Sequence, residues 1–313
     1  MRAVLAKPLD WCTIQLARLN VPNARATGGL AAKVQALLDY PDFFAGDVVA
    51  PADFRFVTRR RFQFSSPAPS PWKRNNTVHG RLYTVSKSWT DEPTVILLHG
   101  WNAQTAYRTL FPHLARRLVR RGVNVAMFQL PYHCRRKPRR GKGAARNFLS
   151  GDLVHVAQAA RQSLADARAL IAWLKQQGSP RIGLWGISLG GWLSGMLACM
   201  EPQVDFAVLM TPVARMDRLI AEAHFCAPIR RSLAGVKLRL DSMNLSAHRP
   251  KVAPENILVV ASQHDLFAPV ETIEELCEAW GVSELWHLRH GHISVLMSMP
   301  VMERIIGWIA NHG

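Results

Sequence analysis

Short apolar runs alternate with segments of helical periodicity from residue 94 to the end of the chain, and this order restricts the fold more than any other feature. Each apolar run has the length of a buried strand, and the segments between them repeat apolar residues at intervals of three and four. The expected strands are 94–98, 123–130, 181–185, 204–210, 257–261 and 284–288. The expected helices are 107–118, 152–177, 190–200, 270–280 and 293–311. This alternation predicts an α/β fold with a mostly parallel central sheet and helices on both faces.

Two parts of the chain fall outside this alternation. Residues 1–50 are interpreted as an N-terminal helical extension, whereas 51–313 form one α/β domain. The domain opens with two alternating segments, 54–64 and 78–85, which we expect to pair as antiparallel strands. At about residues 213–254 the alternation stops in a polar, basic and irregular stretch, which we interpret as a cap-like insertion between two late strands.

The chain is basic, with 39 Lys and Arg against 22 Asp and Glu and a net charge of +17. Such a charge permits binding to nucleic acid, to an anionic membrane surface or to an anionic substrate. The arginines are spread through most segments, which favours a role in solubility. One basic loop, residues 135–142, follows an expected strand and would lie near a site at the strand ends. It is interpreted as a solvated loop, with recruitment of an anionic partner as the alternative.

The cysteines and the absence of a signal sequence suggest a cytoplasmic protein. The five cysteines are odd in number, widely spaced and without a C-x-x-C pair, which is typical of free thiols in a reducing compartment. Residues 182–200 carry no charge and could span a membrane by length. Their five glycines favour a buried strand followed by a buried helix. The oligomeric state stays open, and a homo-oligomer is compatible with the sequence.

The strongest local signal is Gly186-Ile187-Ser188-Leu189-Gly190, a G-x-S-x-G motif between an expected strand and an expected helix. Glycines two positions before and after Ser188 allow the tight turn that exposes a nucleophilic hydroxyl at the edge of the sheet. The helix N-terminus beneath it favours developing negative charge. A glycine-rich turn in the core is the alternative, but the strand-turn-helix context favours a nucleophile.

A second motif, His99-Gly100-Trp101, follows the expected strand 94–98. A loop at this place can direct a backbone N–H at the carbonyl oxygen of a bound acyl group. We expect the N–H groups of Trp101 and Leu189 to form an oxyanion hole. His99 is interpreted as a structural residue that holds the loop, although it could act as a base.

Polar residues also follow the last two expected strands. Asp265 could accept a hydrogen bond from an imidazole and fix its tautomer, with Asp217 the next candidate. Three histidines, His287, His290 and His292, lie at the end of the last strand. We choose His292 as the general base because it follows a glycine in a short loop before the final helix, and His290 is the second choice. The three histidines could also bind zinc, but no matching Glu or Cys pattern accompanies them.

These motifs, each at the end of an expected strand and in the chain order Ser, Asp, His, together resemble the α/β-hydrolase superfamily from about residue 54 onward. The similarity is greatest to bacterial esterase-like or dienelactone-hydrolase-like members. The resemblance implies Ser188 as nucleophile, Asp265 as acid and His292 as base. It also implies that Trp101 and Leu189 occupy the oxyanion positions.

This set of residues predicts a serine hydrolase that cleaves a carboxylic ester of a small molecule through an acyl-enzyme, with no cofactor and no metal. Acyl transfer to an alcohol would use the same residues. A second class is a non-catalytic or acyl-transferring protein of this fold that binds an anionic lipid or another anionic partner through its basic surface. A third is a metallohydrolase built on the three histidines, which a chelator would inhibit.

Overall fold

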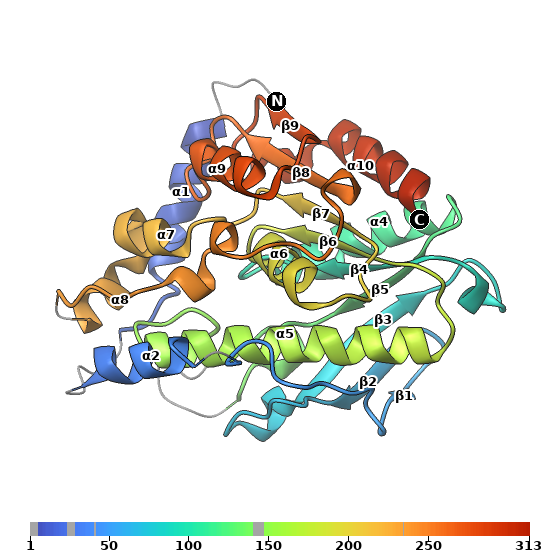
Figure 1. The fold of residues 1–313 in the computed structure, drawn as a ribbon, viewed down its shortest axis with the longest axis horizontal. Helices are drawn as coiled ribbons and strands as arrows, with labels where there is room; N and C mark the ends of the chain where they lie inside the picture. The colour runs from blue at the N-terminus through green and yellow to red at the C-terminus, as the bar shows by residue number, and fades with distance from the viewer. Residues whose placement is uncertain (1–5, 24–28, 41, 140–146, 234) are drawn as a thin grey trace.

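A single mixed sheet forms the centre of the molecule (Figure 1). The computed structural model describes residues 6–23, 29–40, 42–139, 147–233 and 235–313. Within them, nine strands follow the order β1-β2-β3-β5-β4-β6-β7-β8-β9. Their bounds are β1 Arg55–Phe56, β2 Arg61–Ser65, β3 Thr77–Tyr83, β4 Thr94–Leu98, β5 Asn124–Phe128, β6 Ile182–Ile187, β7 Phe206–Met210, β8 Ile257–Ser262 and β9 Leu285–Leu288.

Strands β4 to β9 run parallel, which confirms the predicted mostly parallel sheet. In the register of the central pair, Leu98 of β4 lies beside Gly186 of β6. The carboxyl ends of these two strands therefore meet at one edge of the sheet, and the loops that follow them are brought together there.

The first three strands pair antiparallel with one another, and β3 joins β5 antiparallel, as the alternating segments predicted. The expectation of one strand over 54–64 is wrong, because this segment is a hairpin of β1 and β2. Its turn is closed by the Val57 N–H, which donates to the Arg61 carbonyl at 2.7 Å. Four consecutive polar residues, 58–61, interrupt the strand pattern and allow the chain to reverse there.

Helices cover both faces of the sheet, as predicted. Adjacent residues of β4 show the division, because Val95 packs with α4 and α10 whereas Ile96 packs with α5 and α6. Helix α2 lies along α5 on the second face (Figure 1). The bounds are α1 Ala6–Arg18, α2 Leu30–Leu38, α3 Gln104–Arg108, α4 Leu110–Val119, α5 Leu153–Gln176, α6 Leu189–Met200, α7 Met216–Glu222, α8 Ala227–Ser232, α9 Val270–Trp280 and α10 Met299–His312.

Two helices differ from their expected bounds. The segment 107–118 is divided at Thr109 into α3 and α4. The final helix begins at Met299 and not at 293, because a 3₁₀ turn, Ser294–Met297, precedes it. Pro300 lies in the first turn of α10, where its fixed φ suits the start of a helix.

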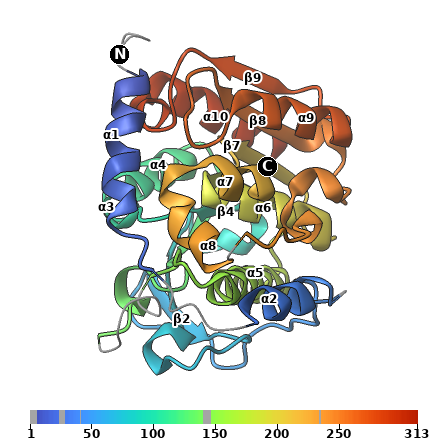
Figure 2. The ribbon, with the colours of Figure 1, turned by 90° about the vertical axis from the view of Figure 1, so that its left-hand side faces the viewer.

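Helices α1, α7 and α8 gather at one end of the molecule (Figure 2). Helices α7 and α8 belong to the segment between β7 and β8, and α1 packs against the turn His224–Cys226 within that segment. The division into an extension and a cap stays a prediction. What the structure adds is that segments far apart in the chain meet above the carboxyl ends of the parallel strands.

The charge-free stretch 182–200 consists of β6 and α6, as predicted. No helix among the described residues is long and apolar enough to cross a membrane.

The interpretation of residues 135–142 as a solvated loop is wrong for Arg136, which is completely buried. Its guanidinium lies 2.7 Å from the Asp166 carboxylate and donates to the carbonyl groups of Asn75 and Gln129. Arg135 is exposed, and residues 140–142 of this loop lie outside the described residues. Part of the basic loop is therefore anchored in the core.

Candidate active site

Ser188 occupies a strained turn between β6 and α6. Its backbone has φ 58° and ψ −116°, a conformation that L-residues rarely adopt. A side chain at Gly186 would overlap the backbone of Gly190, and one at Gly190 would overlap the Leu98 carbonyl. Both glycines of the motif are therefore required by close backbone packing, and the turn directs the Ser188 hydroxyl out of the sheet.

His292 lies between Ser188 and Asp265 and contacts both. Its Nε2 is 2.8 Å from the Ser188 Oγ, and its Nδ1 is 2.7 Å from the Asp265 Oδ2. When Nδ1–H donates to the carboxylate, Nε2 is left to accept the Ser188 proton. Residues 104 and 27 positions apart in the chain thus form one continuous hydrogen-bonded row.

The Asp265 carboxylate is held by its own loop. Its Oδ1 accepts hydrogen bonds from the N–H groups of Phe267 and Ala268, both at 2.8 Å, which leaves Oδ2 for the imidazole. Asp217, the other acid considered, lies on α7 and pairs with Arg215, two positions earlier in the chain. Asp265 is therefore the acid that the fold brings to His292.

Burial and nearby carboxylates act in opposite directions on His292. Burial of the ring lowers its pKa by disfavouring the charged form, whereas the charge and hydrogen bond of Asp265 and the charge of Asp10 raise it. The carboxylates prevail, so the pKa of His292 lies above its ordinary value. This environment stabilises the imidazolium that would form when the ring accepts the Ser188 proton.

The two expected oxyanion donors lie beside Ser188. Leu189 is the first residue of α6, so its N–H has no acceptor within the helix. The Trp101 N–H lies in the loop after β4, and a Cβ placed on the preceding Gly100 would be 3.4 Å from the Ser188 Cβ. Neither N–H has a hydrogen-bond acceptor in the part of the chain that the structure describes. Both are available to an oxyanion, and their role stays a prediction.

His99 holds the Trp101 loop in place. Its Nδ1 lies 2.8 Å from the Gly100 carbonyl, and its Nε2 accepts a hydrogen bond from the Leu130 N–H at 3.1 Å. Burial lowers the pKa of His99 to about 4, so the ring is neutral at pH 7. Its partners are backbone groups, which agrees with the expected structural role.

A cavity of about 410 Å³ opens above Ser188 and His292. Its walls are mainly apolar, and no residue that lines it carries a permanent charge. Large side chains from separate elements form these walls, among them Trp101, Phe148, Trp192, Phe225 and Phe267. Helix α1 closes one side with Thr13, Leu16 and Ala17, and Asn20 lies in the turn that follows it.

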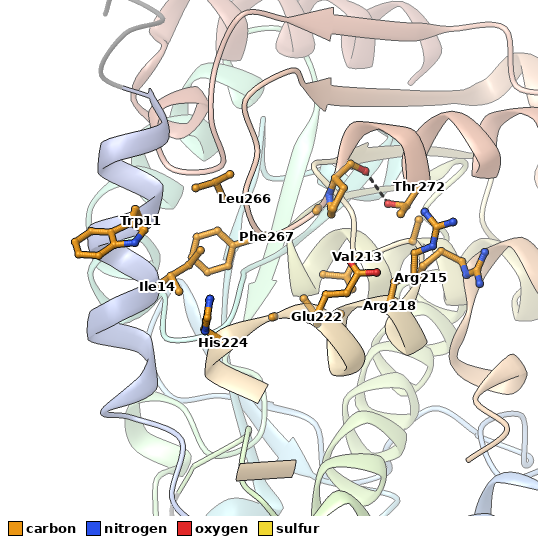
Figure 3. Close-up of a pocket in the computed structure, with 15 residues that line it drawn as sticks. Trp11, Ile14, Val213, Arg215, Arg218, Glu222, His224, Leu266, Phe267 and Thr272 are labelled. Carbon is orange, nitrogen blue, oxygen red and sulfur yellow. Dashed lines mark hydrogen bonds between the residues drawn. The ribbon is translucent and has the colours of Figure 1, made fainter. Parts of the chain in front are cut away.

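A smaller cavity of about 250 Å³ lies beside the first, and Phe267 borders both. Figure 3 shows Ile14 of α1 close to Phe267, with His224 of the segment between β7 and β8 below them. The N-terminal helix, the loop of Asp265 and the insertion therefore meet around one aromatic side chain.

Sequence reasoning missed Asp10, a completely buried carboxylate on α1. It accepts hydrogen bonds from the backbone N–H groups of His292, Ile293 and Leu266, at 2.7, 3.0 and 3.2 Å. The available signal was that Asp10 is the only acidic residue before Asp39. An isolated acid on a mostly apolar helix points to a specific partner, but the sequence does not show which one.

The other two histidines of the last strand do not join His292. His287 Nε2 lies 2.8 Å from the Glu274 carboxylate on α9, and His290 is near Ser294. Among the described residues, no group of three or more His, Cys, Asp or Glu side chains could hold a metal ion. The zinc alternative therefore has no geometric support from the histidines that suggested it.

Comparison with known proteins gives matches in sequence. The profile of a family described as "Alpha/beta hydrolase domain containing 18" matches residues 71–220. The uncharacterized protein Rv2627c of Mycobacterium tuberculosis is 28% identical over 242 residues, covering 72% of this chain and 56% of that protein. The match thus spans little more than half the length of this relative.

Comparison with solved structures gives matches in fold. The Pyrococcus furiosus esterase Pf2001 has a TM-score of 0.56 at 17% identity, covering 85% of this chain and 99% of the esterase. Est1E of Butyrivibrio proteoclasticus, solved with ferulic acid, has a TM-score of 0.52 at 14% identity, covering 75% of this chain and 95% of Est1E. At these identities the likeness establishes a shared fold and nothing about the substrate.

Proposed function

Because the chain has the α/β-hydrolase fold and the profile of an α/β-hydrolase family matches residues 71–220, we propose that it belongs to that superfamily and is a serine hydrolase with Ser188 as nucleophile. The observation that carries the proposal is the unbroken hydrogen-bonded row Ser188–His292–Asp265, which begins at a strained turn and opens into a cavity. Buried polar groups arranged in this way serve nucleophile activation.

The reaction begins when the Ser188 hydroxyl attacks the acyl carbonyl and His292 Nε2 takes its proton. Asp265 orients the ring and stabilises the imidazolium. The N–H groups of Trp101 and Leu189 bind the oxyanion that forms on the carbonyl oxygen. The imidazolium then protonates the leaving group, and His292 activates water to hydrolyse the acyl-enzyme. The chain itself supplies each of these groups.

The cavity supports an uncharged, largely apolar ester as the substrate. Its walls offer few polar partners, so a carboxylate or ammonium on the bound part of the substrate would lose its hydration without compensation. Apolar atoms gain about 0.8 kcal/mol for each buried CH₂ group. We therefore expect kcat/KM to rise as an acyl chain is lengthened until the cavity is full.

The test combines active-site labelling with turnover. A fluorophosphonate probe should label the wild-type protein and fail to label Ser188→Ala, while hydrolysis of p-nitrophenyl esters is lost in the same variant. Butyrate and hexanoate esters should react faster than acetate, and a succinate monoester should react poorly. Equal labelling of Ser188→Ala would eliminate Ser188 as nucleophile, and inhibition by a chelator would favour a metal mechanism.

A further inference from the structure

Asp10 connects the N-terminal helix to both loops that carry His292 and Asp265. Its Oδ2 accepts from the backbone N–H of His292 itself, at 2.7 Å, and from that of Leu266, the residue after Asp265. Its Oδ1 accepts from the N–H of Ile293. The Asp10 carboxylate thus binds backbone N–H groups in both the His292 loop and the Asp265 loop.

The packing around this carboxylate leaves little freedom. A Cβ on Gly291 would lie 2.8 Å from the Asp10 Oδ2 and 3.0 Å from the Ala6 carbonyl oxygen. Glycine at 291 therefore allows the His292 loop to approach α1 closely enough for these hydrogen bonds. The helix is fixed in turn by buried Ile14 and Ala17, which belong to the main core.

Asp10 is suited to act as an anion. All its hydrogen bonds to described residues are ones in which it accepts, from three N–H donors. Burial, the largest influence, and the charge of Asp265 raise the pKa of Asp10, and the three backbone donors offset only part of this rise, so the pKa lies above the ordinary value of an aspartate. N–H groups directed at a carboxylate favour its charged form.

We propose that Asp10 is a positioning residue of the active site, whose carboxylate holds the His292 and Asp265 loops in the geometry needed to activate Ser188. It touches neither the hydroxyl nor the reacting carbonyl, and acts through the backbone of His292 and through its charge. This inference rests on the proposed function, and it makes α1 part of the catalytic unit.

Because Asp10 is charged, its role can be measured through the pKa of His292 as well as through folding. The titratable groups that face the His292 ring are Asp265, from the loop after β8, and Asp10, from α1. His290 lies two residues earlier on the same loop, and its carbonyl accepts from the His264 N–H. Removing the Asp10 charge removes one of the influences that raise the pKa of His292, so the titration of His292 should move to lower pH.

The first variant is Asp10→Asn, which keeps the shape of the side chain. An amide oxygen in the place of Oδ2 still accepts from His292 and Leu266, but the amide NH₂ then faces the Ile293 N–H. We expect kcat to fall about 10- to 100-fold, as for a displacement of about 1 Å at a catalytic group, with KM changed less than threefold. The acid limb of kcat/KM should shift to lower pH.

The matched control is Asp53→Asn, which removes the same charge. The Asp53 carboxylate also accepts from a backbone N–H, that of Ser65. It lies two residues before β1, at the edge of the sheet opposite β9. This variant should keep kcat and the pH profile of the wild type. A second variant, Asp10→Ala, should regain turnover with added formate and not with chloride at equal ionic strength.

A measurement without substrate separates this inference from the proposed function. Histidines labelled with ¹⁵N allow His292 to be titrated by NMR in the wild type, Asp10→Asn and Asp53→Asn. A lower pKa of His292 in Asp10→Asn alone supports the inference, even if no ester is turned over. An unchanged His292 titration, together with wild-type kcat where turnover is seen, would overturn it. Unfolding of both Asp10 variants would also overturn it, because Asp10 would then be a determinant of stability alone.

Discussion

Replacing Gly190 with alanine tests whether the turn at Ser188 needs the close backbone packing seen in the structure. The new Cβ would overlap the Leu98 carbonyl oxygen, would lie 2.5 Å from its carbon and would be 3.0 Å from the His99 carbonyl oxygen. Real Cβ atoms essentially never come within 3.0 Å of such atoms, and the obstructing groups are backbone. The end of β4 or the start of α6 must therefore move.

The expected cost lies at the upper end of the range for overpacking, about 3 kcal/mol of unfolding free energy. Leu98 and His99 lead directly to Trp101, so the same displacement shifts an oxyanion donor. A misplacement of about 1 Å costs on the order of 100-fold in rate, and we expect kcat to fall by about that factor.

Urea unfolding at equilibrium and ester hydrolysis would measure the two effects. Gly307→Ala is the matched control, because Gly307 lies within α10 and a Cβ there meets nothing within 4 Å. That variant should be more stable by about 0.5–1 kcal/mol, since alanine favours a helix over glycine. The reasoning would be refuted if Gly190→Ala unfolded at the wild-type midpoint and kept kcat within twofold.

Three further predictions concern the charged groups. Asp265→Asn should fold normally but lose about 10⁴-fold in kcat, because its amide would favour the wrong tautomer of His292; unchanged turnover would assign the acid elsewhere. In the wild type, His292 must be neutral to accept a proton, so kcat/KM should fall as the pH drops through the pKa of His292. The neighbouring carboxylates raise this pKa. A profile of kcat/KM that is flat from pH 5 to 8 would contradict this prediction. Asp166→Ala leaves Arg136 buried without its ion-pair partner and should cost about 3–5 kcal/mol in urea unfolding, whereas an unchanged midpoint would show that Arg136 reaches water.

The sequence predicted a mostly parallel sheet and the side chains of Ser188, His292 and Asp265 that meet at its edge. Parallel strands place their carboxyl ends together, so the motifs that follow the four strands β4, β6, β8 and β9 could be assigned to one site from the sequence. The prediction of one strand over 54–64 was wrong because the alternation on either side of residues 58–61 was followed, although these four polar residues form the turn of a hairpin. The predicted start of the last helix, residue 293, was wrong by six residues. A 3₁₀ turn occupies 294–297, and α10 begins at 299 with Pro300 in its first turn.

Asp10 and Arg136 could not have been placed in the same way. Each is a charged residue whose partner is fixed by long-range packing and not by local spacing. The Asp10 carboxylate accepts from backbone N–H groups more than 250 positions away, and a backbone donor leaves no trace in residue identity. Arg136 belongs to a run of basic residues, and nothing in that run distinguishes the one side chain that turns inward.

The hydrogen bond between Asp10 and His292 joins positions 282 residues apart, and this separation determines when the site can come into being. During synthesis the serine turn can form as soon as β6 and its neighbours have emerged, but the base arrives only with the last strand of the sheet. The Asp10 carboxylate can bind the Leu266 N–H once the loop after β8 has formed, but its other two donors, His292 and Ile293, come only after β9. A growing chain therefore lacks the contact between Asp10 and the His292 loop until β9 has emerged, so this part of the proposed site would be the last to form.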